Sequence, residues 1–252
     1  MGLVYKANLG LIKSYPEETL AVRKALLQTG QAEVKVKAAK LEAGEVEIIL
    51  LKLDQLAMSV QHEGIALMLA EEAESILAAV RMVKDETKEL FMGIQGLGSS
   101  LDMAWLRPKD VGATTLLNSA ATAGLGLYNG TNGAVYTWLH SFIAGTSSII
   151  IPEQTTIEEA AVVHLGALDA VEIPKVNAIT FTIQGVDSPT QSMPFNIRRS
   201  VGADSLPFVR FEKPIIVGPE KKQKVTLIPN ITGDSKVELL SLLITKASLL
   251  VA

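Results

Sequence analysis

A stretch of 42 residues, from Val111 to Pro152, contains no Asp, Glu, Lys or Arg. Only His140 can titrate within it, and small or weakly polar residues dominate, with aromatic residues toward its end. An exposed surface of this composition would be adhesive, so we expect the segment to be buried against its own domain or against a partner. The chain must therefore fold, or assemble, around a large uncharged region.

Part of this segment has the length of a transmembrane helix, because Ala134 to Ile151 is an uncharged run of 18 residues, near the minimum that spans a bilayer. Hydroxyl side chains, His140 and Gly145 interrupt the run, and no cluster of Lys or Arg flanks it as an orientation signal. We therefore do not expect membrane insertion.

The whole chain is more apolar than an average soluble protein, with 48% hydrophobic and 20% charged residues and a mean hydropathy of +0.30. Its 252 residues can bury one large core or two smaller ones. The 23 basic and 27 acidic residues are mixed along the chain. This mixing argues against a dedicated nucleic-acid binder, which concentrates Lys and Arg for phosphate contacts.

The chain has no cysteine. This excludes a disulfide framework, thiolate zinc sites, iron–sulfur ligation and a cysteine nucleophile. The first residues lack the ordered regions of a secretory signal, so we expect cytoplasmic synthesis. The Met-Gly start is followed by Lys6 where a myristoylation signal has Ser or Thr, so we expect no acylation.

The front half predicts helices and one hairpin. Pro16 to Gly30 has the start and stop signals of a short helix. Alternation from Gln31 to Lys52, with a β-rich run at Val46–Leu51, predicts an extended hairpin. From Leu53 to Phe91 apolar residues recur at helical spacing, which predicts one long helix or two in tandem, packed on both flanks.

The back half predicts strands. Thr156 and Glu159 form a capping-box pattern ahead of Ala160–Ala170, which predicts one more short helix. After Pro174 the apolar period becomes two, and turn sequences separate five to seven such runs. We therefore predict an α+β chain with a helical, hairpin-bearing assembly region at 1–152 and an antiparallel β-sandwich or jelly-roll-like domain at 153–252.

Candidate catalytic groups are few. His62, His140 and His164 lie in different predicted elements, and none has a second histidine at the spacing of a helical metal site. His164 and Asp169 are the starting pair for an enzyme hypothesis, although five residues separate them. The glycines of Gly93–Ser100 follow a predicted helix and precede no lysine, unlike a phosphate-binding loop. We expect no catalytic, cofactor or metal site.

Two basic clusters, Arg198–Arg199 and Lys221–Lys224, are predicted at strand ends or turns. No aromatic residues are interleaved with them, so they indicate solvated sheet edges, or at most weak contact with a packaged genome. Asn129–Thr131 and Asn230–Thr232 fit the glycosylation sequon, a pattern that often arises by chance.

The runs Phe208–Glu220, Lys224–Pro229 and Val237–Ile244 have a proline-marked strand, a further strand, a polar turn and an apolar closing strand. From Val171 to Val251 the chain resembles, in this style, the β-rich ends of viral and phage coat proteins. Its front half is similar to the tailed-phage capsid architecture of arm (Met1–Gly30), hairpin (Gln31–Lys52) and long helix (Leu53–Phe91). The C-terminal pattern is closer to a jelly roll.

The leading hypothesis is a non-enzymatic structural subunit of a virion that assembles with copies of itself. One alternative is an attachment or ligand-binding β-sandwich module that displays aromatic residues on loops; its candidates are Trp105, Tyr128, Tyr136 and Trp138. A second alternative is a hydrolase with scattered carboxylates.

The charge-free segment supplies a test of the leading hypothesis. We expect Leu139→Lys to abolish assembly or folding, because an unpaired charge would be buried. Lys222→Glu should be nearly silent, since an exposed pair contributes only ~0–1 kcal/mol. Size-exclusion profiles of the two variants would show the difference; parent-like assembly of the Leu139 variant would mean that the segment is not a packing core.

Overall fold

The computed structural model describes residues 41–60, 63–93, 99–107, 110, 117–118, 137–169, 173–185, 190–192 and 208–250. The helix predicted at Pro16–Gly30, the start of the predicted hairpin and most of the charge-free segment lie outside these ranges.

The described chain begins with helices and continues with strands. The helices are α3 (Ala43–Val60), α4 (Glu63–Glu71), α5 (Ala73–Thr87) and, at the end, α7 (Ala247–Leu250). The strands are β1 (Leu101–Trp105), β2 (Leu117–Asn118), β3 (Thr137–Phe142), β4 (Ser148–Thr156), β5 (Ala160–Asp169), β6 (Val176–Ile183), β7 (Thr190–Ser192), β8 (Phe208–Val217), β9 (Lys222–Pro229) and β10 (Gly233–Lys246). This α+β class confirms the coarse prediction.

The strands form two sheets of five strands each. In sheet A the order is β1-β10-β5-β8. Strand β1 pairs with the C-terminal part of β10, and β3 pairs with the N-terminal part of β10. In sheet B the order is β2-β4-β9-β6-β7. Every pairing between the described strands is antiparallel.

From β3 onward the strands pair from the outside inward. β3 pairs with β10, β4 with β9, β5 with β8 and β6 with β7, so the chain runs out and back as one long two-stranded ribbon. The ribbon is wound so that β5 also pairs with β10 and β6 with β9. The winding places alternate parts of the ribbon in opposite sheets.

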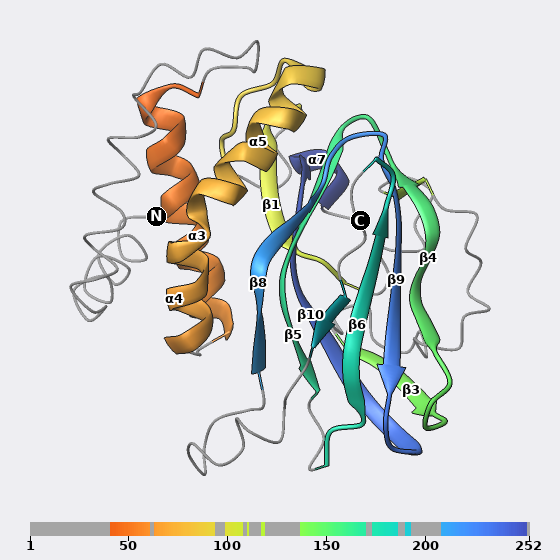
Figure 1. The fold of residues 1–252 in the computed structure, drawn as a ribbon. Coiled ribbons are helices and arrows are strands. Elements are labelled where there is room, and N and C mark those ends of the chain that lie inside the picture. Colours follow the sequence, from red (N-terminus) through yellow and green to blue (C-terminus); the bar gives the residue numbers. More distant parts are fainter. Residues whose placement is uncertain are drawn as a thin grey trace.

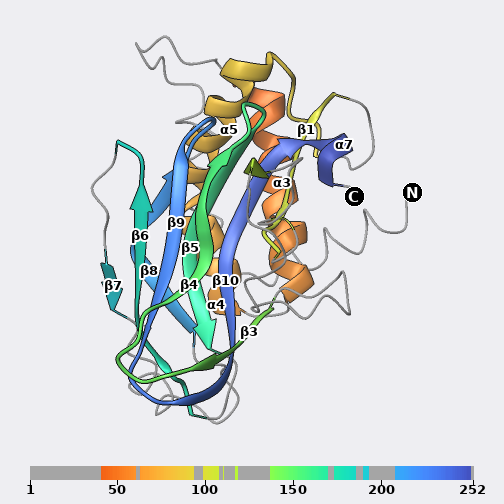
Figure 2. The same ribbon diagram turned by 90° about the vertical axis from the view of Figure 1, so that its right-hand side faces the viewer.

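The molecule has three layers, which Figures 1 and 2 show from two sides. Helices α3, α4 and α5 cover one face of sheet A, and sheet B faces the other. On β5, Ala161, Val163 and Leu165 pack in the helix-facing core, whereas Ala160 and Val162 pack between the sheets. The central strand β5 of sheet A is therefore buried on both faces.

The predicted strand at Val46–Leu51 is wrong, because these residues lie in α3. Six apolar residues of this helix are buried: Val46, Ile49, Leu50, Leu53, Leu56 and Ala57. They recur about every three to four residues, which places them on one face of a helix. The β-branched residues of a short window indicated a strand, but the period continues past residue 51. The prediction of one long helix or two in tandem over Leu53–Phe91 holds only for its helical character. The range contains the end of α3, all of α4 and all of α5, which ends at Thr87.

The expected burial of this helical region holds in part. Ile76 and Val80 are fully buried, whereas Leu67 is half-buried and the side chain of Val60 lies outside the described set.

The predicted helix at Ala160–Ala170 is also wrong, because Ala160–Asp169 is the central strand β5. All ten of its residues are buried. A strand buried on both faces loses the apolar–polar alternation that identifies strands in a sequence. The supposed cap residues have other partners: the Thr156 hydroxyl donates to the Gly218 carbonyl at 2.6 Å, and Glu159 pairs with Lys246 at 2.6 Å.

The expected domain division between residues 152 and 153 falls inside strand β4. Strands β1 and β3, from the first segment, pair with β10 from the second. The two stretches of sequence therefore share both sheets. Among the turn sequences expected between the strands, Gly218–Pro219 lies between β8 and β9, and Asn230–Asp234 covers the β9–β10 turn and the first two residues of β10.

Candidate functional site

A polar bridge crosses the core between the two sheets. His164 projects from β5, and its Nε2 lies 3.0 Å from Oε1 of Gln223 on β9 in the opposite sheet. Its Nδ1 lies 2.7 Å from Oγ of Ser241 on the neighbouring strand β10. All three residues are buried. With Nε2–H donating to the amide oxygen, Nδ1 accepts from the serine hydroxyl, which is the arrangement of a neutral imidazole.

Burial determines the charge of this histidine. It lowers the pKa of His164 from 6.5 to about 4, against the smaller raising effect of the Gln223 hydrogen bond. The ring also packs on Phe181, with ring centroids 4.9 Å apart, and Phe181 packs edge-on against Phe211 at 5.2 Å. His164 is therefore a neutral, enclosed member of the core.

Asp169, at the end of β5, holds the β5–β6 connection. Its buried carboxylate accepts hydrogen bonds from the backbone amides of Lys175 (2.8 Å) and Val176 (3.3 Å) and from the Ser235 hydroxyl (2.5 Å). His164 and Asp169 thus have separate partners, and the described contacts do not join them into an acid–base pair. Their spacing on β5 serves two structural tasks.

We expect Asp169→Asn to lower the free energy of unfolding by about 1–3 kcal/mol, because an amide presents a donor to a site that contains three donors. Chemical denaturation monitored by circular dichroism measures the loss. The matched control is Asp234→Asn, whose exposed carboxylate accepts from the Ser141 hydroxyl. Equal losses in the two variants would contradict the anchoring role of Asp169.

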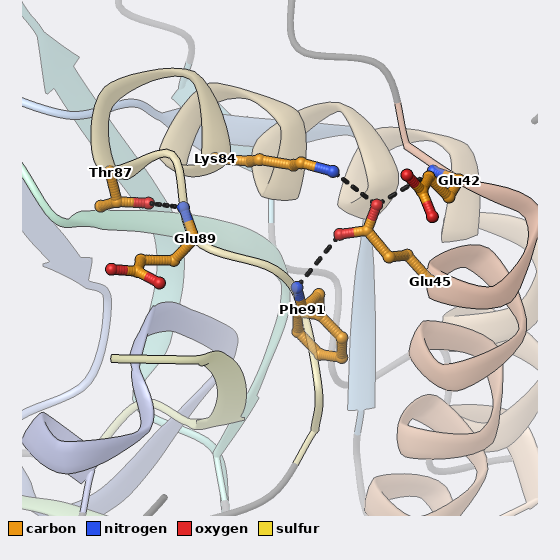
Figure 3. A network of polar contacts seen from close by, with 6 residues as sticks. All are labelled: Glu42, Glu45, Lys84, Thr87, Glu89 and Phe91. Atoms are coloured by element: carbon orange, nitrogen blue, oxygen red, sulfur yellow. Dashed lines mark hydrogen bonds and ion pairs between the residues drawn. The ribbon is translucent and has the colours of Figure 1, made fainter. Parts of the chain in front are cut away.

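Glu45 joins the helical layer to the chain that enters sheet A (Figure 3). Its Oε2 accepts from the Glu42 amide at 2.9 Å, as in the second half of a capping box, and lies 2.5 Å from Lys84 Nζ on α5. Its Oε1 accepts from the Phe91 amide at 3.1 Å. One buried carboxylate therefore links the start of α3, helix α5 and the approach to β1.

A second polar link lies between Lys52 on α3 and Asp102 on β1. Lys52 Nζ lies 2.9 Å from Asp102 Oδ1 and 3.1 Å from Oδ2. The side chains are 10% and 0% exposed, so the ion pair is removed from water. Arg210 on β8 adds an outer link by pairing with Glu71 and Glu72, at the junction of α4 and α5.

One end of the sandwich is built from three loop segments, at the lower end in Figures 1 and 2. The Gly145 amide donates to the Pro229 carbonyl at 2.9 Å, and the Asn230 amide donates to the Lys175 carbonyl at 2.9 Å. The Ala144 amide donates to the Thr232 hydroxyl at 3.1 Å. The β9–β10 turn therefore lies between the β3–β4 loop and the start of β6.

The remaining sequence candidates have varied outcomes. Trp105, expected on a loop, is buried in β1 at 8% exposure. Lys221 and Lys222 are exposed at the β8–β9 turn, and Lys222 lies 3.6 Å from Glu153. Asn230 and Thr232 of one sequon are exposed. Outside the described side chains lie His62, His140, Tyr128, Tyr136, Trp138, Leu139, Arg198, Arg199, the other sequon and most of Gly93–Ser100.

Among the described residues, no group of three or more His, Asp or Glu side chains is placed to hold a metal ion. No helix among the described residues is long and apolar enough to cross a bilayer.

The sequence matches no protein-family model and no curated protein. Among solved structures, a ruminal GH26 endo-β-1,4-mannanase has 9% identity and a TM-score of 0.25, with coverage of 62% of this chain and 27% of that one. A family GH115 4-O-methyl-α-glucuronidase has 12% identity and a TM-score of 0.19, with coverage of 51% and 19%. The chain thus spans about a quarter of the enzymes' length or less. Likenesses this low establish neither a shared fold nor a shared activity.

Proposed function

We propose that this protein is a jelly-roll subunit that assembles with copies of itself into a viral shell. The observation that supports it is the order of strands β3 to β10, which is β3-β10-β5-β8 in sheet A and β4-β9-β6-β7 in sheet B. A jelly roll is a double-sheet structure of eight antiparallel strands built from two Greek keys. Winding a long two-stranded ribbon produces this order.

Jelly rolls occur in viral capsids, lectin domains and cupins. Whether side chains fill the interior between the sheets helps to distinguish these classes. Large side chains fill it: Phe142, Phe181 and Phe211 are at most 2% exposed. A sandwich whose interior is filled by side chains fits a structural scaffold better than a protein that binds a ligand in an internal cavity. The proposed site of action is then the outer surface, where isoleucines 143 and 173 are exposed.

We expect purified protein to form particles of many copies rather than monomers. Native mass spectrometry and negative-stain electron microscopy at increasing protein concentration measure this directly. A folded chain that stays monomeric at high concentration, with circular dichroism typical of sheet and helix, would contradict the proposal. The location in a virion, after cytoplasmic synthesis, is part of the same proposal.

Contact with a packaged genome is a weaker part of this proposal. It would involve the exposed side chains of Lys221 and Lys222 at the β8–β9 turn. Few lysines give a shallow salt dependence of nucleic-acid affinity, because each neutralised phosphate adds about one unit to the slope.

The same strand order supports a second candidate, an attachment or ligand-binding module, since lectin domains also use jelly rolls. A glycan-binding screen on the purified protein separates the two functions. Saturable glycan binding by a monomer would favour the module, and assembly without binding would favour the shell.

A further inference from the structure

Exposed isoleucine side chains stand on two of the loop segments at this end of the sandwich. Ile143 is 64% exposed and Ile173 is 55% exposed, the two highest values among the large apolar side chains of the described residues. Ile231, in the turn between them, is half-buried. We name Ile143–Thr146, Ile173 and Asn230–Thr232 the isoleucine tip.

The tip is held firmly by the backbone. The three bonds that join its loops come from main-chain amides, at 2.9–3.1 Å. The exposed isoleucines therefore project from an ordered end and are not needed to fill the core. Leaving such side chains in water forgoes about 1.5–3 kcal/mol for each one that a contact could bury fully.

The charges around the tip restrict what can cover it. None of the tip residues is ionisable, and among the described residues Lys175 and Asp234 border the tip. Around a rotation axis, a group close to the axis meets copies of itself, so a charge would meet a like charge while isoleucine meets isoleucine. A different protein partner imposes no such restriction, since a charged tip can meet an opposite charge.

A membrane is a less fitting occupant. Loops and helices that rest in the bilayer interface combine apolar residues with Trp or Tyr and with Lys or Arg on the polar side. The tip has no aromatic residue, and its described charged neighbours, Lys175 and Asp234, are of opposite sign. Anionic lipid would attract the first and repel the second, so it would gain little net attraction.

We propose that the isoleucine tip is a contact between copies of this chain around a rotation axis of the assembly. This inference rests on the proposed self-assembly and assigns one contact surface within it. Each added copy buries the same isoleucines, so a small patch is multiplied by the symmetry.

Ile143→Lys in the full chain tests the inference. The new ammonium groups would converge on the axis, and we expect the protein concentration at half-assembly to rise by at least about 100-fold. Light scattering with size-exclusion chromatography measures it, while unchanged circular dichroism and denaturation midpoint show that the subunit still folds. The matched control is Met82→Lys on α5, where the methionine is 44% exposed near the β8–β9 turn.

The outcomes separate the inference from the function on which it rests. The inference is supported if the parent and Met82→Lys form particles while Ile143→Lys stays monomeric. If Ile143→Lys assembles like the parent, or Met82→Lys fails as completely, the assignment to the tip is overturned while self-assembly stands. If the parent is monomeric, both fail. If the parent floats with phosphatidylcholine–phosphatidylglycerol vesicles and Ile143→Lys assembles without floating, the tip is a membrane contact and the inference is overturned.

Discussion

Asp102→Ala is expected to lower the free energy of unfolding by about 3–5 kcal/mol, the cost of leaving one member of a buried ion pair without its partner. The Lys52 side chain is only 10% exposed, so its ammonium would stay largely enclosed without its counter-charge. Urea denaturation of the variant and parent, with equal m-values, measures the difference.

The control for this prediction removes both charges. Lys52→Met with Asp102→Leu replaces the pair by apolar side chains of similar size, and we expect a stability within about 1–2 kcal/mol of the parent or above it. A loss below about 1 kcal/mol in Asp102→Ala would show that the ammonium escapes to solvent and that the pair does not hold the helical layer to the sheet.

The sequence predicts some strands well because of where they lie. In β6 and β9 the buried and more exposed positions alternate along most of the strand. Among the described residues, only one face of sheet B is covered, and sheet A covers it. This alternation is visible in the residues Val176, Ile179, Phe181 and Ile183 once β6 is followed beyond its first residues. The central strand β5 is covered on both faces, so its sequence lacks the apolar–polar alternation that identifies a strand. The capping-box pattern ahead of it then led to the wrong prediction of a helix.

The candidate site was harder to foresee. In the sequence, Ser241 lies 77 residues from His164 and Gln223 lies 59 residues from it. No pattern of local spacing could therefore predict these contacts. In the same way, Ile143 and Ile150 have the same chemistry within one apolar run, but the first is 64% exposed and the second 1%. Only the winding of the ribbon decides which isoleucine faces water.

The neutral state of His164 gives the sandwich a dependence on acid. Between pH 6.5 and about 4 the unfolded chain binds a proton at this histidine, whereas the folded chain does not, because burial lowers the folded pKa to about 4. The stability is therefore fully present above pH 6.5 and is lost as the pH falls toward 4. Below that value both states are protonated, and the contribution changes no further.

We expect this one group to remove about 3 kcal/mol of stability between pH 7 and pH 4, as 1.36 kcal/mol corresponds to each pKa unit. Since carboxylates titrate in part of the same range, the measurement is the difference between the parent and His164→Gln, which keeps a polar group in reach of Gln223. Denaturation free energies at half-unit steps of pH should fall more steeply in the parent. Parallel curves for the two proteins would mean that His164 is not enclosed between the sheets by its hydrogen bonds to Gln223 and Ser241.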